Sequence, residues 1–137
     1  LEVVDLDLYK TLNGFVKKAF EQYTSVYSGI LQNNDPVSTW TTKVQKTKAG
    51  GGYHQWHCEN GQFLYRDRVL AWMVYLNTVP SQSGGGTDFL HQKLTLQPEA
   101  GTIVLWPASY THVHRGGFLT GNVDKYIATG WFIREPT

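Results

Sequence analysis

Two hydrophobic spacings divide the chain into a short first part and a longer second part. Between residues 5 and 28, apolar side chains recur at every third or fourth position, which is typical of an amphipathic α-helix. Asp5 or Asp7 is placed to cap its first turn. From residue 40 onward, alternating positions and short apolar runs rich in β-branched and aromatic side chains predict strands. We therefore expect a leading helix that packs on the outside of a sheet, followed by a β core over residues 40–134.

Turns rich in glycine, proline and asparagine divide the β core into short strands. Residues 68–77 are a nearly continuous apolar run, which predicts a buried strand, whereas residues 29–38 carry turn residues and predict a loop. The expected strands are 40–47, 53–59, 68–77, 87–90, 93–96, 102–106, 112–115 and 125–133. About eight strands, one helix and no internal repeat predict a mainly-β sandwich or barrel, a fold that holds small ligands in its mouth.

Composition and charge exclude several classes of function. The 137 residues are enough for one domain, which we expect to span residues 1–137. A net charge of +1 and the lack of a basic run give no reason to expect a nucleic-acid partner. No apolar run approaches the roughly 20 residues of a membrane span, and no signal peptide is visible, so we expect a cytoplasmic protein. The first residue is Leu rather than Met, which leaves a missing N-terminal segment open.

The candidate chemistry begins with His57 and Glu59, two positions apart in an expected strand. Side chains of a strand repeat their direction every second residue, so this imidazole and this carboxylate would point the same way. Such a pair is a weak signal alone, because most His-x-Glu pairs are solvated surface residues. Two further histidines, His112 and His114, lie near the other end of the chain. Two imidazoles and one carboxylate on one face are the ligands of non-haem Fe(II) oxygenases.

Lys125 opens the last apolar strand of the chain. A lysine at such a place is often an edge residue that prevents strand-to-strand association. If it faces the interior of the barrel instead, its ammonium needs an anion, because an unpaired buried charge is costly. A dicarboxylate cosubstrate would supply that anion.

Several short motifs follow one another through the second part of the chain. They are His57-x-Glu59, Arg68 leading into Tyr75-Leu76-Asn77, Gly85-Gly86-Thr87-x-Phe89, Pro98-x-x-Gly101-Thr102, and His114 followed by Lys125-Tyr126 and Trp131. Together they resemble the catalytic core of the prolyl 4-hydroxylase-like Fe(II)/2-oxoglutarate-dependent dioxygenases, and short bacterial and viral members are the most similar. The resemblance covers residues 53–131, in the family's order.

This resemblance implies a double-stranded β-helix, or jelly roll, with iron between its two sheets. The implied site residues are His57, Glu59 and a distal histidine for Fe(II), Lys125 and the Tyr75 hydroxyl for the C5 carboxylate of 2-oxoglutarate, and Thr129 or Thr47 for one more hydrogen bond. The implied reaction uses O2 to hydroxylate an unactivated C–H bond, with a peptidyl proline as the favoured acceptor. It decarboxylates 2-oxoglutarate to succinate and CO2, and ascorbate is a candidate reductant.

The distal histidine is either His114 or His112. His114 precedes Lys125 by eleven positions and is followed by Arg-Gly, as the ligand is in similar short family members, so it is preferred. His112 is favoured by its place five residues after Pro107. Since the two would point the same way from a strand, His112 would otherwise support the site or face the substrate. One departure from the family pattern is Glu59, where Asp is more common.

A peptide or protein is the expected partner, because a short chain leaves a rather open site. Candidates for the substrate side are Trp56, Tyr110 and Arg115, and the loops expected to set specificity are 29–38, 60–67 and 79–86.

The alternative function is a non-catalytic jelly roll that binds a metal or a sugar, since this fold hosts unrelated functions. A lectin-like module would have little use for a lysine inside the barrel. A cupin enzyme would carry a glutamate a few residues after its His-x-His, whereas the next glutamate after His114 is Glu135. The sequence therefore favours the dioxygenase.

Overall fold

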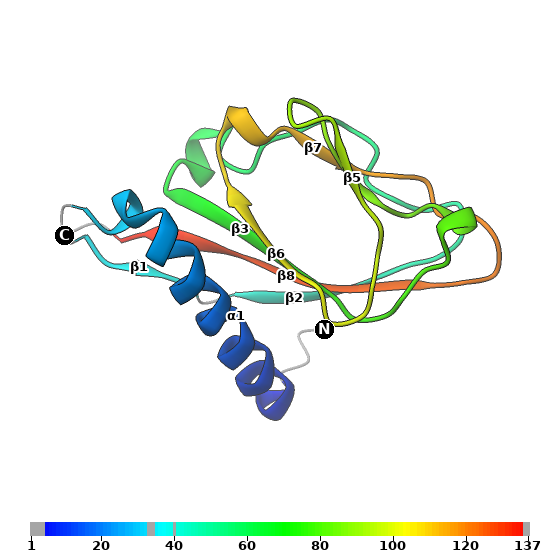
Figure 1. The fold of residues 1–137 in the computed structure, drawn as a ribbon, viewed down its shortest axis with the longest axis horizontal. Helices are drawn as coiled ribbons and strands as arrows, with labels where there is room; N and C mark the ends of the chain where they lie inside the picture. Colours follow the sequence, from blue (N-terminus) through cyan, green and yellow to red (C-terminus); the bar gives the residue numbers. More distant parts are fainter. Residues whose placement is uncertain (1–4, 33–34, 40, 136–137) are drawn as a thin grey trace.

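A leading helix and two antiparallel sheets make up the fold, and the computed structural model describes residues 5–32, 35–39 and 41–135 (Figure 1). The helix is α1 (Leu6–Val26). The strands are β1 (Val37–Ser38), β2 (Thr42–Thr47), β3 (Arg68–Tyr75), β4 (Thr87–Phe89), β5 (Leu94–Leu96), β6 (Ile103–Pro107), β7 (His114–Gly116) and β8 (Lys125–Arg134). Short 3-10 helices lie at Ser28–Leu31, Phe63–Tyr65, Ser81–Ser83 and Tyr110–His112.

Helix α1 begins and packs as its sequence pattern predicts. The Asp5 carboxylate accepts a hydrogen bond from the Leu8 backbone N–H at 2.9 Å, which caps the first turn. The buried Leu12 and Val16 pack against Leu70 and Trp72 of β3, so the helix covers the outer face of the larger sheet (Figure 1). Among the described residues, no helix has the length and apolar character needed to cross a membrane.

The larger sheet is ordered β1-β8-β3-β6, and β2 also pairs with β8. Strand β8 is the central strand of this sheet, because β1, β2 and β3 all pair with it in antiparallel register. Alternate residues of β8 face opposite ways. Ala128 and Phe132 lie in the core beneath the helix, whereas Lys125, Thr129 and Trp131 line a cavity on the inner side.

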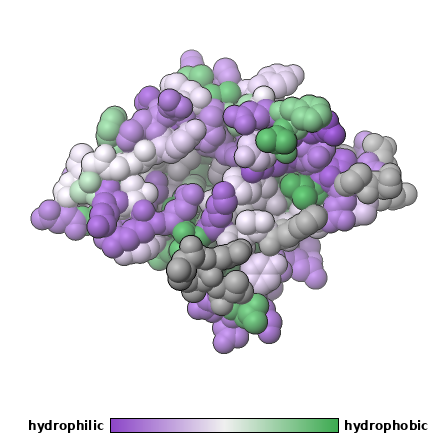
Figure 2. Space-filling view, turned by 180° about the vertical axis from the view of Figure 1, so that it is seen from behind, coloured by the Kyte–Doolittle hydropathy of each residue, from purple (hydrophilic) through white to green (hydrophobic). Residues whose placement is uncertain are grey.

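The smaller sheet is ordered β5-β4-β7. Its Phe89 lies in a second core cluster between the two sheets, together with Ala71, Met73, Tyr75 and Trp106 of the larger sheet. Beyond this cluster the space between the sheets is not filled by side chains and forms the cavity. The surface opposite the view of Figure 1 is mainly polar, with apolar residues in small separate groups (Figure 2).

The structure corrects three of the predicted elements. Residues 53–59 are not a strand. Only His57 forms a bridge, with His114, and the Glu59 backbone N–H turns to the carbonyl of Ala108 instead. Its backbone partners lie on different elements, in β7 and at Ala108 just after β6, so no continuous ladder forms.

The second correction is that His112 lies in a 3-10 helix, so it does not share a strand face with His114. The third is that residues 29–38 are not all loop, because they contain most of the first 3-10 helix and all of β1. The predicted strand at 40–47 is observed as β2, although its first position, residue 40, lies outside the described part of the chain.

We expect Leu12→Ala to lower the free energy of unfolding by about 3 kcal/mol, because it removes a buried side chain from a packed core. Leu12 is 5% exposed and Leu6, in the same helix, is 60% exposed. The matched variant Leu6→Ala should therefore change stability by less than about 0.5 kcal/mol. Urea denaturation of both variants measures the difference. Equal losses would contradict the packing of α1 on the larger sheet.

Candidate metal centre and adjoining cavity

A cavity of about 480 Å³ lies between the two sheets and holds most of the predicted site residues. Its walls come from β2, β3, β6 and β8 of the larger sheet, from β4 and β7 of the smaller sheet, and from several residues between 52 and 65. Chain segments far apart in sequence are thereby brought to one hollow. The cluster of possible metal ligands lies at one place on its wall, and Lys125 at another.

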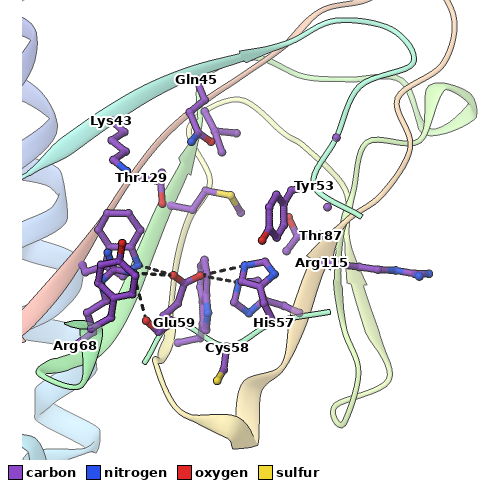
Figure 3. Close-up of a pocket in the computed structure, with 18 of the residues that line it drawn as sticks. Lys43, Gln45, Tyr53, His57, Cys58, Glu59, Arg68, Thr87, Arg115 and Thr129 are labelled. Atoms are coloured by element: carbon purple, nitrogen blue, oxygen red, sulfur yellow. Dashed lines mark hydrogen bonds and ion pairs between the residues drawn. The ribbon is translucent and has the colours of Figure 1, made fainter. Parts of the chain in front are cut away.

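His57, Glu59 and His114 form that cluster, with ligand atoms that all lie within 4.8 Å of one another. Glu59 Oε1 is 2.9 Å from His114 Nε2 and 3.4 Å from His57 Nε2 (Figure 3). His112 is not part of this cluster, and its Nδ1 lies 3.0 Å from the Thr111 hydroxyl oxygen. The cluster thus holds His114 rather than His112.

Backbone carbonyls fix the direction of both imidazoles. His57 Nδ1 is 2.9 Å from the Gln55 carbonyl oxygen, and His114 Nδ1 is 2.9 Å from the His112 carbonyl oxygen. A carbonyl only accepts, so Nδ1 carries the proton and the Nε2 lone pair points at Glu59. Three lone-pair atoms that face one another repel unless a proton or a metal cation lies between them. Two neutral imidazoles and a carboxylate are ligands that suit Fe(II), so the residues fit that ion.

Hydrogen bonds keep the Glu59 carboxylate charged. Burial alone would raise the pKa of Glu59, but hydrogen bonds from His114 and His57 in their protonated forms, and from the Trp131 N–H, outweigh it and hold that pKa well below its usual range. The hydrogen bond to Glu59 in turn raises the pKa of His57 above its ordinary value. The lowered pKa of Glu59 and the raised pKa of His57 both indicate a site that attracts positive charge.

The second oxygen of Glu59 is held by two residues whose role the sequence did not reveal. Trp131 Nε1 donates a hydrogen bond to Glu59 Oε2 at 2.7 Å. Arg68 Nη1 lies 3.6 Å from the same oxygen and donates to the Glu59 backbone carbonyl at 3.2 Å. A sequence signal existed for Trp131, because it stands six positions after Lys125 and hence on the same face of β8.

Lys125 is buried in the cavity wall, with 7% of its surface exposed. Its Nζ donates to the Gly85 carbonyl oxygen at 2.6 Å, and no carboxylate within the described ranges forms an ion pair with it. Burial lowers the pKa of Lys125. The edge position considered for this lysine is therefore wrong, and its ammonium faces the hollow without a counter-ion.

The other residues predicted near Lys125 lie at different depths. The Tyr75 hydroxyl is 2.7 Å from the Thr87 hydroxyl and donates to the Leu96 carbonyl at 3.3 Å. Thr87, which was not among the predicted site residues, lines the cavity, whereas Tyr75 lies fully buried behind it. Thr129 and Thr47 both line the cavity, and the Thr129 hydroxyl donates to the Trp72 carbonyl at 2.8 Å.

Of the three substrate-side candidates, only Arg115 lines the cavity. Its guanidinium lies 4.3 Å from the centre of the Trp56 ring and is paired with Asp88 at 3.0 Å. Tyr110 is 77% exposed and lies outside the cavity wall. Lys43, which the sequence analysis did not single out, does line it (Figure 3).

Among the solved structures that resemble this fold are three prolyl hydroxylases. A viral collagen prolyl hydroxylase from Paramecium Bursaria Chlorella virus-1, in its 2OG complex, matches with a TM-score of 0.71 and 20% identity over 88% of this chain and 72% of that chain. A Pseudomonas putida prolyl-4-hydroxylase matches with a TM-score of 0.56 and 23% identity over 69% and 52%. A Trichoplax adhaerens prolyl hydroxylase, in complex with a hypoxia inducible factor peptide fragment, matches with a TM-score of 0.61 and 19% identity over 85% and 56%.

At these identities the likeness shows the fold, and it confirms the predicted double-stranded β-helix. No curated protein sequence matches the chain. A family model does match, over residues 42–133, and it describes the 2OG-Fe(II) oxygenase superfamily. Its range begins at β2 and ends inside β8, so it contains the metal-ligand cluster, Lys125 and the cavity between them. Since the match covers more than half of the sequence, the chain belongs to the 2OG-Fe(II) oxygenase superfamily and is a 2-oxoglutarate/Fe(II)-dependent dioxygenase.

Proposed function

We propose that this dioxygenase hydroxylates an unactivated C–H bond, with a peptidyl proline as the favoured acceptor. The observation that carries the proposal is the pairing of two sites in one cavity. A cluster of three lone-pair donors and a buried ammonium without a counter-ion both line the same hollow. A cation and a dianionic cosubstrate would satisfy both at once. A sugar-binding or purely metal-binding module would leave Lys125 unexplained.

His57, Glu59 and His114 are the proposed ligands of Fe(II). The carbonyls of Gln55 and His112 keep both imidazoles in the tautomer that presents Nε2, so the site is oriented before the metal arrives. When bound, Fe(II) and 2-oxoglutarate supply the oxidising chemistry, in which O2 converts the cosubstrate to succinate and CO2 and hydroxylates the substrate. Ascorbate is the proposed reductant that keeps the iron in its Fe(II) form.

Lys125 is the proposed partner of the 2-oxoglutarate C5 carboxylate. Its Nζ is held at the Gly85 carbonyl, which directs the ammonium but leaves its charge unpaired. Thr87 lines the cavity and is hydrogen-bonded to Tyr75, so the Tyr75 hydroxyl is proposed to act through Thr87 rather than by direct contact. Thr129 is proposed to take part through its hydroxyl oxygen, because its proton is given to the Trp72 carbonyl.

A peptide or protein is the proposed substrate because the cavity opens directly at the surface. Aromatic side chains lie around this opening. Tyr53 and Tyr65 line the cavity and are 60% and 41% exposed, and the neighbouring Trp56 is 40% exposed. Exposed aromatic rings offer flat apolar surface to a peptide. Support also comes from the similar Trichoplax adhaerens structure, which is a complex with a peptide fragment.

His114→Ala should lower succinate release from 2-oxoglutarate by about a hundredfold or more, because it removes a metal ligand. The matched variant His112→Ala should keep most of the activity, since its side chain lies outside the ligand cluster and its carbonyl is unchanged. The assay contains Fe(II), O2 and ascorbate. Turnover that survives His114→Ala but not His112→Ala would reverse the assignment of the distal ligand.

Lys125→Met should raise the thermal unfolding midpoint at neutral pH while weakening 2-oxoglutarate binding at least about tenfold. Burial lowers the pKa of Lys125 below the ordinary value of 10.5, so the folded state carries a charge penalty in full below the lowered pKa. This penalty disappears as the pH approaches 10.5. The difference between the thermal unfolding midpoints of Lys125→Met and wild type should therefore become smaller as the pH rises from neutral to about 10.

Thermal unfolding without cosubstrate measures the midpoints, and calorimetry measures 2-oxoglutarate binding. Lys48→Met, at an exposed lysine, is the control that should change neither quantity. A lower midpoint for Lys125→Met at neutral pH, or unchanged cosubstrate affinity, would contradict the proposed role.

Proline-containing peptides should gain the mass of one oxygen when incubated with the protein, Fe(II), 2-oxoglutarate and O2. The same peptides with alanine in place of proline should gain none. Mass spectrometry of both series measures the outcome. If 2-oxoglutarate turnover depends on His114 but no proline peptide gains oxygen, the proposed acceptor is wrong while the proposed metal centre stands.

A further inference from the structure

We propose that Trp131, together with Arg68, is a positioning residue that restricts Glu59 to a single metal-binding oxygen. This inference rests on the proposed role of Glu59 as a metal ligand, and it concerns how many of its two oxygens bind the metal. Glu59 Oε1 faces the two histidines at 2.9 Å and 3.4 Å. Glu59 Oε2 is turned away from them and is engaged by the indole N–H of Trp131 at 2.7 Å.

Arg68 supports this arrangement from the side. Its guanidinium carbon lies 3.8 Å from the centre of the Trp131 ring and 3.9 Å from the centre of the Tyr65 ring, so it is stacked between them. One of its nitrogens donates to the Glu59 backbone carbonyl, which ties the main chain of the ligand to the same stack. Trp131 is therefore braced by a cation on its ring, and the N–H that it gives to Glu59 has a fixed direction.

The length of the Glu59 side chain explains why its orientation has to be restricted. Glutamate has one more rotatable bond than aspartate, so its carboxylate can turn and offer both oxygens to a metal. Three protein ligands leave three of six positions for 2-oxoglutarate, which chelates, and for O2. A carboxylate that bound through both oxygens would occupy one of these three. The hydrogen bond from Trp131 keeps the second oxygen on the protein side.

Burial makes the interaction strong enough to act in this way. The Glu59 side chain is 12% exposed and the Arg68 side chain is 16% exposed, so neither charge is well screened by water. A hydrogen bond to an ionised group in such surroundings is stronger than one between neutral groups. Trp131 also adjoins the apolar cluster between the sheets, so a purely structural role must be separated from the positioning role.

The test compares Trp131→Phe with Trp72→Phe. Both variants remove one indole N–H that donates a hydrogen bond, since Trp72 Nε1 donates to the Thr39 hydroxyl at 3.1 Å. Trp72 lies in the core on the helix side of the sheet and contacts no proposed ligand. Phenylalanine keeps an aromatic ring in both places. Any loss that comes only from a weakened fold should therefore appear in both variants.

Mn(II) affinity and the visible absorption of bound Co(II) are the readouts, and neither depends on turnover. We expect Trp131→Phe to bind Mn(II) about tenfold to a hundredfold more weakly than wild type. Its Co(II) bands should also change in position and intensity, because a second carboxylate oxygen replaces one solvent ligand and alters the ligand field. Trp72→Phe should match wild type in both. Arg68→Met, which keeps the apolar stem, should move both readouts in the same direction as Trp131→Phe by a smaller amount.

Affinity and absorption that match wild type in Trp131→Phe and Arg68→Met would overturn the proposal, as would equal losses in Trp72→Phe. If Trp131→Phe does not fold, Arg68→Met decides by the same two readouts. The wild type and His114→Ala separate this proposal from the proposed function. If wild type binds no Mn(II), or His114→Ala binds it as tightly as wild type, the metal centre itself is wrong.

Discussion

Three lone-pair atoms that point at one another need positive charge between them, and the rest of the site follows from that need. Nε2 of His57, Nε2 of His114 and Oε1 of Glu59 converge because each imidazole is held at its far nitrogen by a backbone carbonyl. A proton between one pair leaves the third atom facing another lone pair. A divalent cation accepts all three, which is why this arrangement favours a metal over a hydrogen-bonded network.

Strand β8 joins the metal centre to the proposed cosubstrate site. Its inner face carries Lys125, Thr129 and Trp131, and its outer face packs beneath α1 through Ala128 and Phe132. The same alternation that buries the core thus places an ammonium and the donor to Glu59 on one wall of the cavity. A shift of β8 by one residue would turn all of these side chains to the wrong side. Pairing with β1, β2 and β3 fixes its register.

The parts of this structure that depend on local periodicity could be predicted from the sequence. The helix, a cap at Asp5 or Asp7 and the last apolar strand follow from spacing and chemistry within one segment, whereas the side faced by Lys125 was left open. The segment at 53–59 could not be predicted in this way, because its hydrogen bonds go to Ala108 and His114, far along the chain. The position of Arg68 between the rings of Tyr65 and Trp131 could not be predicted either, since a charged residue at the start of an apolar strand does not indicate which side chains it will contact.

The central claim is that one hollow holds a cation at three side chains and a dicarboxylate at Lys125. Titration of Fe(II)-loaded protein with 2-oxoglutarate in the absence of O2, followed by visible absorption, tests it most directly. A charge-transfer band should appear only when Fe(II) and 2-oxoglutarate are both present, and it should saturate at one 2-oxoglutarate per chain. Binding of 2-oxoglutarate without any change in absorption, or no binding at all, would contradict it.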